Sequence, residues 1–315
     1  MPTESLSIDG GLLPSWNDST TKSAILDLVA AVTLEGGPDF VPPAQRIAVF
    51  DNDGTLWCEQ PAQVQVLFAR QRAAEMAAAD PSLRDRQPFK AFLEHDVAAI
   101  HALGKQGVFE FAMAIHAGMT TEAFEATVRD WFVRARHPTF DRPMAGIVFQ
   151  PQIELLDFLR AHGFKTFIVS GGGVDFMRPF AEAAYGIPPE QVIGSSVKYR
   201  FDAADDGPCQ IVKLAELGSF DDRDAKPANI ALHIGRRPIL CFGNFDGDLA
   251  MLRYTISGTG RRLGLLLHHD DTTREVAYDR EFRLSPLVEA LDRSDAFGIR
   301  VVSMKRDWGT VFPRP

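Results

Sequence analysis

The chain has 315 residues, of which 45% are apolar and 24% are charged, a profile typical of a globular protein with one large domain or two ordinary ones. Its formal net charge of -9 argues against a nucleic acid partner, because binding a phosphate backbone needs a clustered basic face. The three cysteines, Cys58, Cys209 and Cys241, are widely spaced, which disfavours a disulfide framework or a zinc site and indicates small core residues in a reducing compartment.

The sequence predicts a cytoplasmic protein with no membrane partner. Residues 1–7 lack the basic start and apolar run of a signal peptide. No later segment reaches the roughly 20 apolar residues that a membrane helix needs. The sequence assigns no oligomeric state.

The first predicted elements are a helix and a strand. Residues 22–32 have a helical pattern, with possible N-caps at residues 18–20 and a stop at the glycine-proline turn of residues 36–38. Residues 46–50 are a short apolar run that ends in the polar segment from Asp51 to Thr55. This pattern is typical of a buried strand that delivers carboxylates at its C-terminal end.

Residues 59–143 have a different pattern. Apolar residues such as Val64, Leu67 and Phe68 recur at helical spacing, and β-branched runs are few. Prolines and glycines at residues 81, 88, 104, 107 and 118 divide the segment into four or five helices. We therefore predict an all-helical subdomain inserted after the first strand, with aromatic residues that pack mainly against one another.

Strands and helices alternate again after residue 150. We predict a helix over residues 153–161, strands at 165–169, 193–197, 238–242 and 263–267, and a hairpin of residues 197–201 with 209–214. The fold class is therefore α/β, with a doubly wound, mainly parallel sheet built from residues 1–58 and 144–315, on which the helical segment of residues 1–40 packs. Ligands of such sheets bind beyond the carboxyl ends of the strands, where three polar clusters of this chain would meet.

Asp51 and Asp53 form the first polar cluster, two residues apart at a strand end. Two carboxylates at close range repel each other, so either a cation lies near them or one of them holds a proton. In both cases one can attack phosphorus as an anion while the other carries a proton to the leaving oxygen and later takes one from water. A solvated Asp-Asn-Asp-Gly turn is the competing interpretation.

Two further clusters follow later strands. Ser170, Gly171 and Gly172 present a hydroxyl and backbone N–H groups at a strand end, an arrangement that suits a phosphate, and Lys226 could add an ammonium. The third cluster supplies oxygen ligands of the kind that Mg²⁺ prefers, together with waters. Its members are Asn244, Asp246 and Asp248.

Together these residues resemble the haloacid dehalogenase (HAD) superfamily, particularly its phosphoserine-phosphatase-like branch. The resemblance covers about 205 residues. It implies a Rossmann-like core, an inserted cap and a phosphorylated Asp51, with Asp53 as general acid and then base, and Ser170 and Lys226 as ligands of the phosphoryl group. It also implies Mg²⁺ bound by the Asp51 carboxylate, the Asp53 backbone carbonyl and the first polar residue of the last motif.

That last residue is usually aspartate in the family but is Asn244 in this chain. An amide oxygen can bind a hard cation but contributes no charge, so we predict weaker magnesium retention than in the family and weaker than in an Asn244→Asp variant. Asp246 could instead be the direct ligand. Asp248 could then act through water, or it could hold Lys226.

Further residues are candidates for substrate contact. Thr55, Gly171 and Gly172 belong to the phosphate motifs. Glu59 could face the substrate, although a solvent-facing acid at a helix start is the favoured alternative. Arg178 could meet a substrate carboxylate or second phosphate, with a surface salt bridge as the favoured alternative. Residues 268–271, two histidines and two aspartates, are predicted to be a loop at the rim of the sheet.

We therefore predict a magnesium-dependent phosphatase for a small phosphorylated metabolite, because a lid of about 85 residues leaves little room for a folded protein substrate. Three alternatives remain open. A carbon-halogen hydrolase would need neither Asp53 nor magnesium. A phosphotransferase or mutase would use the same four motifs, and a catalytically inactive binding protein is favoured only by Asn244.

Overall fold

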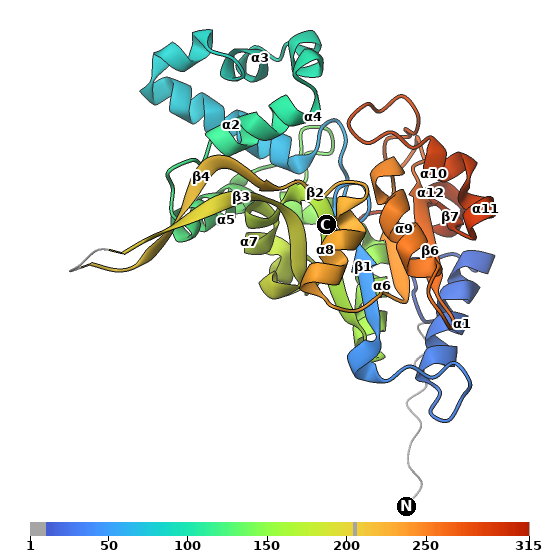
Figure 1. Ribbon diagram of the computed structural model, residues 1–315. Coiled ribbons are helices and arrows are strands. Elements are labelled where there is room, and N and C mark those ends of the chain that lie inside the picture. Colours follow the sequence, from blue (N-terminus) through green and yellow to red (C-terminus); the bar gives the residue numbers. More distant parts are fainter. Residues whose placement is uncertain (1–10, 204–206, 315) are drawn as a thin grey trace, which may run out of the picture.

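The computed structural model describes residues 11–203 and 207–314 (Figure 1). Within them, seven strands form one sheet in the order β4-β3-β2-β1-β5-β6-β7. Neighbouring strands run parallel, except that β3 and β4 form an antiparallel hairpin. The strands are β1 (Ile47–Phe50), β2 (Lys165–Gly173), β3 (Val192–Asp202), β4 (Gln210–Ser219), β5 (Leu240–Gly243), β6 (Leu263–His268) and β7 (Arg300–Ser303). The fold class is α/β, as the sequence predicts.

Helices cover both faces of this sheet because its central strands are apolar on both sides. Successive residues of a strand point to opposite faces, so Ala48 and Phe50 of β1 join one core while Ile47 and Val49 join the other. The first core contains α1 (Thr20–Thr33), α6 (Gln150–Ala161) and α7 (Val174–Tyr185), and the second contains α8 (Ala225–His233) and α9 (Leu249–Ile256). Short helices α10 (Glu289–Asp292), α11 (Ser294–Phe297) and α12 (Met304–Asp307) flank β7.

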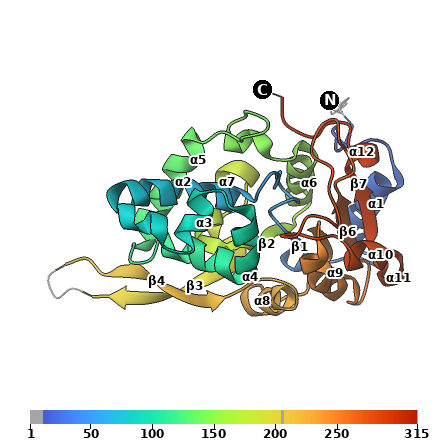
Figure 2. The same ribbon diagram turned by 90° about the horizontal axis from the view of Figure 1, so that it is seen from above.

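The segment between β1 and α6 is helical and has two parts. Helices α2 (Val64–Ala79), α3 (Phe89–Leu93) and α4 (Val97–Ala114) form a group at the top of the view in Figure 1, where α4 contacts β4. Helix α5 (Thr121–Arg134) packs against α7 of the core. Gly104 has a φ of 62° and interrupts α4, at one of the predicted breaks. Figure 2 shows the β3–β4 hairpin projecting past this group, on the side away from α10 and α11.

Short 3-10 helices complete the secondary structure. They span Pro43–Gln45, Pro81–Asp85, Met144–Ile147, Pro189–Gln191 and Asp246–Asp248. Ser19 is the N-cap of α1 and accepts a hydrogen bond from the backbone N–H of Lys22. Strand β7 was not predicted. The signal-peptide prediction for residues 1–7 and part of the predicted hairpin turn lie outside the described residues.

The cysteines and the helix lengths test two further expectations. Cys58 and Cys241 are buried free thiols, as expected of core residues, but Cys209 is exposed at the hairpin, so its assignment to the core is wrong. Among residues 11–203 and 207–314, no helix combines the length and the apolar character needed to cross a bilayer.

Candidate active site

A cavity of about 100 Å³ lies between the strand ends and the helical group. Its floor contains Asp51, Asp53, Ser170, Gly171 and Gly172. Its roof is apolar and comes from α2 and α4: Val66, Ala69, Val108, Phe111 and Ala112. Gln63, Gln65, Phe220, Asp222, Phe245, Leu284 and Ser285 complete the lining. The structure thus brings residues from the first two predicted clusters together at one cavity.

Lys226 connects the first and third clusters beneath this floor. Its ammonium donates to Asp51 Oδ1 at 2.8 Å and to Asp248 Oδ1 at 2.5 Å, and it donates to the Val169 carbonyl at 3.0 Å. All three charged side chains are buried. Burial alone would lower the pKa of Lys226, but the charges of Asp248 and Asp51 raise it well above its usual value. Lys226 therefore stays positively charged beside Asp51. Asp248 binds Lys226 directly, which is one of the two roles that the sequence leaves open for Asp248.

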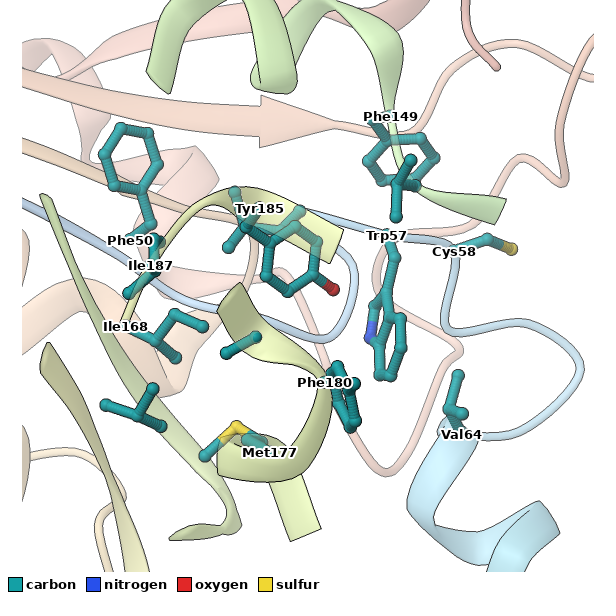
Figure 3. Close-up of a cluster of buried hydrophobic side chains, with 14 of the residues drawn as sticks. Phe50, Trp57, Cys58, Val64, Phe149, Ile168, Met177, Phe180, Tyr185 and Ile187 are labelled. Atoms are coloured by element: carbon teal, nitrogen blue, oxygen red, sulfur yellow. The ribbon is translucent and has the colours of Figure 1, made fainter. Parts of the chain in front are cut away.

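Asp53 is held by an aromatic group behind the cavity. The indole N–H of Trp57 donates to Asp53 Oδ1 at 2.8 Å. Trp57 stacks on Phe180 at 4.9 Å and meets Tyr185 edge-on at 6.2 Å (Figure 3). Burial, and then the charges of Glu59 and Asp51, raise the pKa of Asp53 to about 7. A carboxyl group with this pKa can both donate and accept a proton near neutral pH.

The glycine segment after Ser170 allows the close approach of one residue from α2. Strand β2 carries a register irregularity between Ser170 and Gly173, and the backbone N–H of Gly172 donates to Ser170 Oγ at 3.2 Å. The N–H of Gly173 donates to Gln65 Oε1 of α2 at 2.8 Å. A Cβ at Gly173 would lie 2.8 Å from Gln65 Nε2, too close for any side chain there. Glycine at position 173 therefore lets Gln65 of α2 approach the floor closely.

Asn244 is buried beside the floor, at the end of β5. Its Oδ1 accepts from the Thr55 hydroxyl at 2.9 Å, and its Nδ2 donates to Glu59 Oε1 at 3.0 Å. Thr55 is fully buried and does not line the cavity. Its contact is with Asn244, and it lies below the floor.

Glu59 is 0% exposed, so the favoured interpretation as a solvent-facing acid at a helix start is wrong. Helix α2 begins only at Val64. The Tyr278 hydroxyl donates to Glu59 Oε1 at 2.8 Å and the Ser285 hydroxyl to Oε2 at 2.9 Å. Burial raises the pKa of Glu59, while these hydrogen bonds and the charge of His269 oppose the rise.

The segment 269–285 supplies contacts that the sequence prediction missed. His269 lies in the predicted loop directly after β6, but its side chain is only 1% exposed. Its ring lies 2.7 Å from the Gly54 carbonyl through Nε2 and 3.1 Å from Glu275 through Nδ1. The position of His269 directly after β6 is the one sequence feature that indicates a contact with the site, because Tyr278 and Ser285 belong to no recognisable motif.

Asp246 and Arg178 lie outside the cavity. Asp246 Oδ1 accepts from the backbone N–H groups of Val288 and Ala290, both at 2.9 Å, so this carboxylate orders the start of α10 and is not directed at the floor. Arg178 donates to the carbonyls of Pro189 at 3.0 Å and Val192 at 3.4 Å. The structure therefore supports neither Asp246 as a metal ligand nor Arg178 as a substrate or phosphate ligand.

The charge balance of the floor fits a hard cation. Asp51, Asp53, Glu59 and Asp248 are buried carboxylates in or beside the group that Lys226 organises. No set of three or more His, Cys, Asp or Glu side chains with metal-binding geometry occurs among the described residues. Mg²⁺ needs only one or two protein carboxylates together with neutral oxygens and water. Asp51, the Asp53 carbonyl and the Asn244 amide oxygen are ligands of this kind.

Solved structures with the same overall fold include two proteins of unknown function. One, from Anaerococcus prevotii DSM 20548, is 16% identical with a TM-score of 0.56 over 90% of this chain and 91% of that chain. The other, from Bordetella pertussis Tohama I, is 16% identical with a TM-score of 0.53 over 82% of this chain and 98% of that chain. A phosphoserine phosphohydrolase-like protein from Francisella tularensis subsp. tularensis SCHU S4 is 18% identical with a TM-score of 0.41, over 80% and 98% of the two chains.

Comparison with curated proteins gives no match. The sequence model of the haloacid dehalogenase-like hydrolases matches residues 48–253, about two thirds of the chain. The matched segment begins in β1 and ends in α9, so it contains Asp51, Asp53, Ser170, Lys226 and Asn244. The chain belongs to the haloacid dehalogenase-like hydrolase family.

Proposed function

We propose that this hydrolase is a magnesium-dependent phosphatase that acts on a small phosphomonoester through a phospho-aspartate at Asp51. The observation that carries the proposal is the contact of buried Lys226 with Asp51 at 2.8 Å, in a floor that also contains Asp53 and Ser170. This set holds a nucleophile, a fixed cation, a hydroxyl and a carboxyl group able to exchange a proton.

The reaction has two steps. Lys226 holds Asp51 Oδ1, and the second carboxylate oxygen attacks phosphorus while the bond from phosphorus to the ester oxygen breaks. Asp53 gives its proton to the leaving oxygen, which departs as an alcohol. Water then attacks phosphorus and loses a proton to Asp53. The bond from phosphorus to Asp51 breaks, which releases inorganic phosphate and restores both aspartates.

Magnesium, when bound by the Asp51 carboxylate, the Asp53 carbonyl and the Asn244 amide oxygen, would neutralise phosphoryl oxygens as charge develops on them. Ser170 and the Gly171 and Gly172 N–H groups would hold the same phosphoryl oxygens. The proton-exchanging Asp53 beside the nucleophile favours this chemistry over carbon-halogen hydrolysis, which does not use a second acid.

The apolar roof supports a small substrate with an apolar organic group. Val66, Val108 and Phe111 face the floor across the cavity, so a group attached to the phosphate would bury its surface against them. The helices that carry these residues would close over the bound ester and exclude water.

A phosphate-release screen tests the proposal. The protein is assayed over a panel of small phosphomonoesters with Mg²⁺ and without any added acceptor, beside Asp51→Asn. We expect turnover that EDTA abolishes and that Asp51→Asn lowers by at least about a hundredfold, because a nucleophile is lost. Asp246→Asn is the matched control, since the amide oxygen still accepts both backbone hydrogen bonds, and it should stay within about threefold of wild type. Full activity of Asp51→Asn would exclude the covalent route, and turnover only with an acceptor would indicate a phosphotransferase.

A further inference from the structure

Glu59 and Asn244 form a buried pair of unequal charge immediately below the floor. Glu59 Oε1 and Asn244 Nδ2 lie 3.0 Å apart, and the two residues are 0% and 1% exposed. Gly54 covers the pair with a backbone φ of 76°, and a Cβ at that position would overlap both the amide and the carboxylate. Glycine at position 54 is therefore needed both for the positive φ of the turn and for the space that Glu59 and Asn244 occupy.

The carboxylate decides which way the Asn244 amide points. Both oxygens of Glu59 accept hydrogen bonds, from the Tyr278 and Ser285 hydroxyls, so the amide must turn its NH₂ group toward the carboxylate. This leaves Oδ1 on the other side, where the Thr55 hydroxyl donates to it at 2.9 Å and takes one of its two lone pairs. The second lone pair remains for another donor or a cation.

Glu59 is itself fixed and does not line the cavity. The hydroxyls of Tyr278 and Ser285 hold its two oxygens at 2.8 and 2.9 Å. Of these residues only Ser285 reaches the cavity lining. Glu59 can therefore act on the floor through Asn244, by its charge and by the hydrogen bond, rather than by contact with a substrate.

We infer that Glu59 is a positioning residue for the metal, which orients Asn244 and supplies the negative charge that this amide ligand lacks. The inference rests on the proposed function, because it assumes magnesium at this floor. A carboxylate that accepts from a ligand's N–H fixes the ligand's orientation and increases the electron density on its coordinating atom. Loss of such a partner typically costs about 10–100-fold in metal affinity.

The test moves the charge from one member of the pair to the other. Magnesium affinity is measured by isothermal titration calorimetry, with Mg²⁺ alone and no substrate, for wild type, Glu59→Gln, Asn244→Asp and the double variant. Glu59→Gln keeps a carbonyl oxygen that can accept from Asn244, and we expect it to lose about 10–100-fold in affinity. The double variant keeps a carboxylate-to-amide hydrogen bond with its polarity reversed, and we expect its affinity to return to within about threefold of wild type or to exceed it.

Thermal unfolding in EDTA gives an independent measurement without metal or turnover. Asn244→Asp alone puts two carboxylates in a buried contact, so we expect its melting temperature to fall by about 4 °C or more, and adding Glu59→Gln should reverse this fall. If Glu59→Gln does not fold alone, the comparison of Asn244→Asp with the double variant still decides.

Glu275→Gln is the matched control for magnesium affinity, because Glu275 is a buried acid bonded to Cys58 and His269 instead of Asn244. Its magnesium affinity should stay within about threefold of wild type.

These measurements distinguish failure of the role inferred for Glu59 from failure of the proposed phosphatase activity. A Glu59→Gln affinity within threefold of wild type, or a double variant no tighter than Glu59→Gln, would overturn the role of Glu59 and leave the phosphatase proposal standing. If wild type binds magnesium and follows the expected cycle but releases no phosphate from any ester, the phosphatase proposal fails alone. Absence of magnesium binding by wild type would reject both.

Discussion

The floor and the roof of the cavity are held together by different forces. Charged hydrogen bonds at strand ends fix the floor, where Lys226 lies 2.8 Å from Asp51 and 2.5 Å from Asp248. Apolar ring contacts hold the roof, where Phe111 stacks on Phe92 at 3.8 Å and meets Phe89 edge-on at 5.5 Å. Charged hydrogen bonds demand one geometry, whereas ring packing tolerates changes of shape that conserve volume. For the proposed reaction we therefore expect the chemistry to reside in the floor and the selection among substrates to reside in the roof.

Several polar contacts between described residues join the helical group to the rest of the chain, among them those of Gln63 with Ser285 and of Gln71 with Trp131. The N–H of Gly173 donates to Gln65 of α2. After α4, the Gly118 N–H donates to the Lys213 carbonyl at 2.9 Å, and the Lys213 N–H donates to the Met119 carbonyl at 2.9 Å. A change in the floor should alter the rate constant of the reaction, and a change in the roof should alter which substrate is held.

The largest effect should come from the proton-exchanging acid. Asp53→Asn keeps an oxygen that can accept from the Trp57 indole but cannot take a proton from water, so breakdown of the phosphoenzyme should slow by about a hundredfold or more. Rapid quench of a single turnover, with an activated aryl phosphate whose phenolate leaves without a proton from Asp53, would show phosphoenzyme accumulating after a burst of the phenol. Equal slowing of both steps, with no accumulation, would count against a base role for Asp53.

A change in the roof should have an intermediate effect and act mainly on binding. Phe111→Ala removes a ring from the cavity lining, so we expect KM for an aryl phosphate to rise about tenfold, with kcat changed much less. Steady-state kinetics over alkyl and aryl esters measures this. Phe89→Ala is the matched control, because Phe89 packs on the same ring but does not line the cavity. Both variants should lose about 3 kcal/mol of stability, and equal KM values in the two would remove Phe111 from the binding surface.

The smallest effect should appear at the joint between roof and core. His116 is buried against Phe124, and burial followed by the charge of Lys213 lowers the pKa of His116 to about 3. The unfolded chain therefore binds a proton that the folded chain does not, so stability present above pH 6.5 is lost as the pH falls toward 3. By pH 5 the free energy of unfolding should have fallen by about 2 kcal/mol through His116 alone. Urea unfolding should show this loss in wild type and a reduced loss in His116→Gln.

Exposed His101 supplies the control for this measurement. His101→Gln should follow the wild-type pH profile. An unchanged profile in His116→Gln would mean that another group causes the acid sensitivity.

The sequence predicts the sheet and its polar ends well because buried parallel strands leave continuous apolar runs. The runs that became β1, β2, β5 and β6 each precede a polar or glycine-rich segment. Strand β7 was missed because its four residues follow two very short helices. The pairing of β7 with β6 depends on tertiary contacts, which a local sequence pattern does not encode.

The environment of Glu59 could not be predicted for a related reason. Its partners Tyr278 and Ser285 lie 219 and 226 residues further along the chain, in a segment without periodic pattern. The choice between Asn244 and Asp246 was equally unreadable, since both carry suitable oxygens after the same strand. The turn into the 3-10 helix Asp246–Asp248 favours Asn244, because it directs Asp246 to the N–H groups of residues 288 and 290.

The burial of Glu59 limits where the chain could bend if α2–α4 close over a bound ester as we propose. The chain runs from Asp53 through Glu59 to α2, so any swing of α2–α4 pulls on this connection. Glu59 is clamped by Asn244, Tyr278 and Ser285, and a swing that dragged it would break buried hydrogen bonds. If α2–α4 close over a bound ester as we propose, the pivot on this side would lie beyond Glu59, and the residues of the floor would keep their positions during closure.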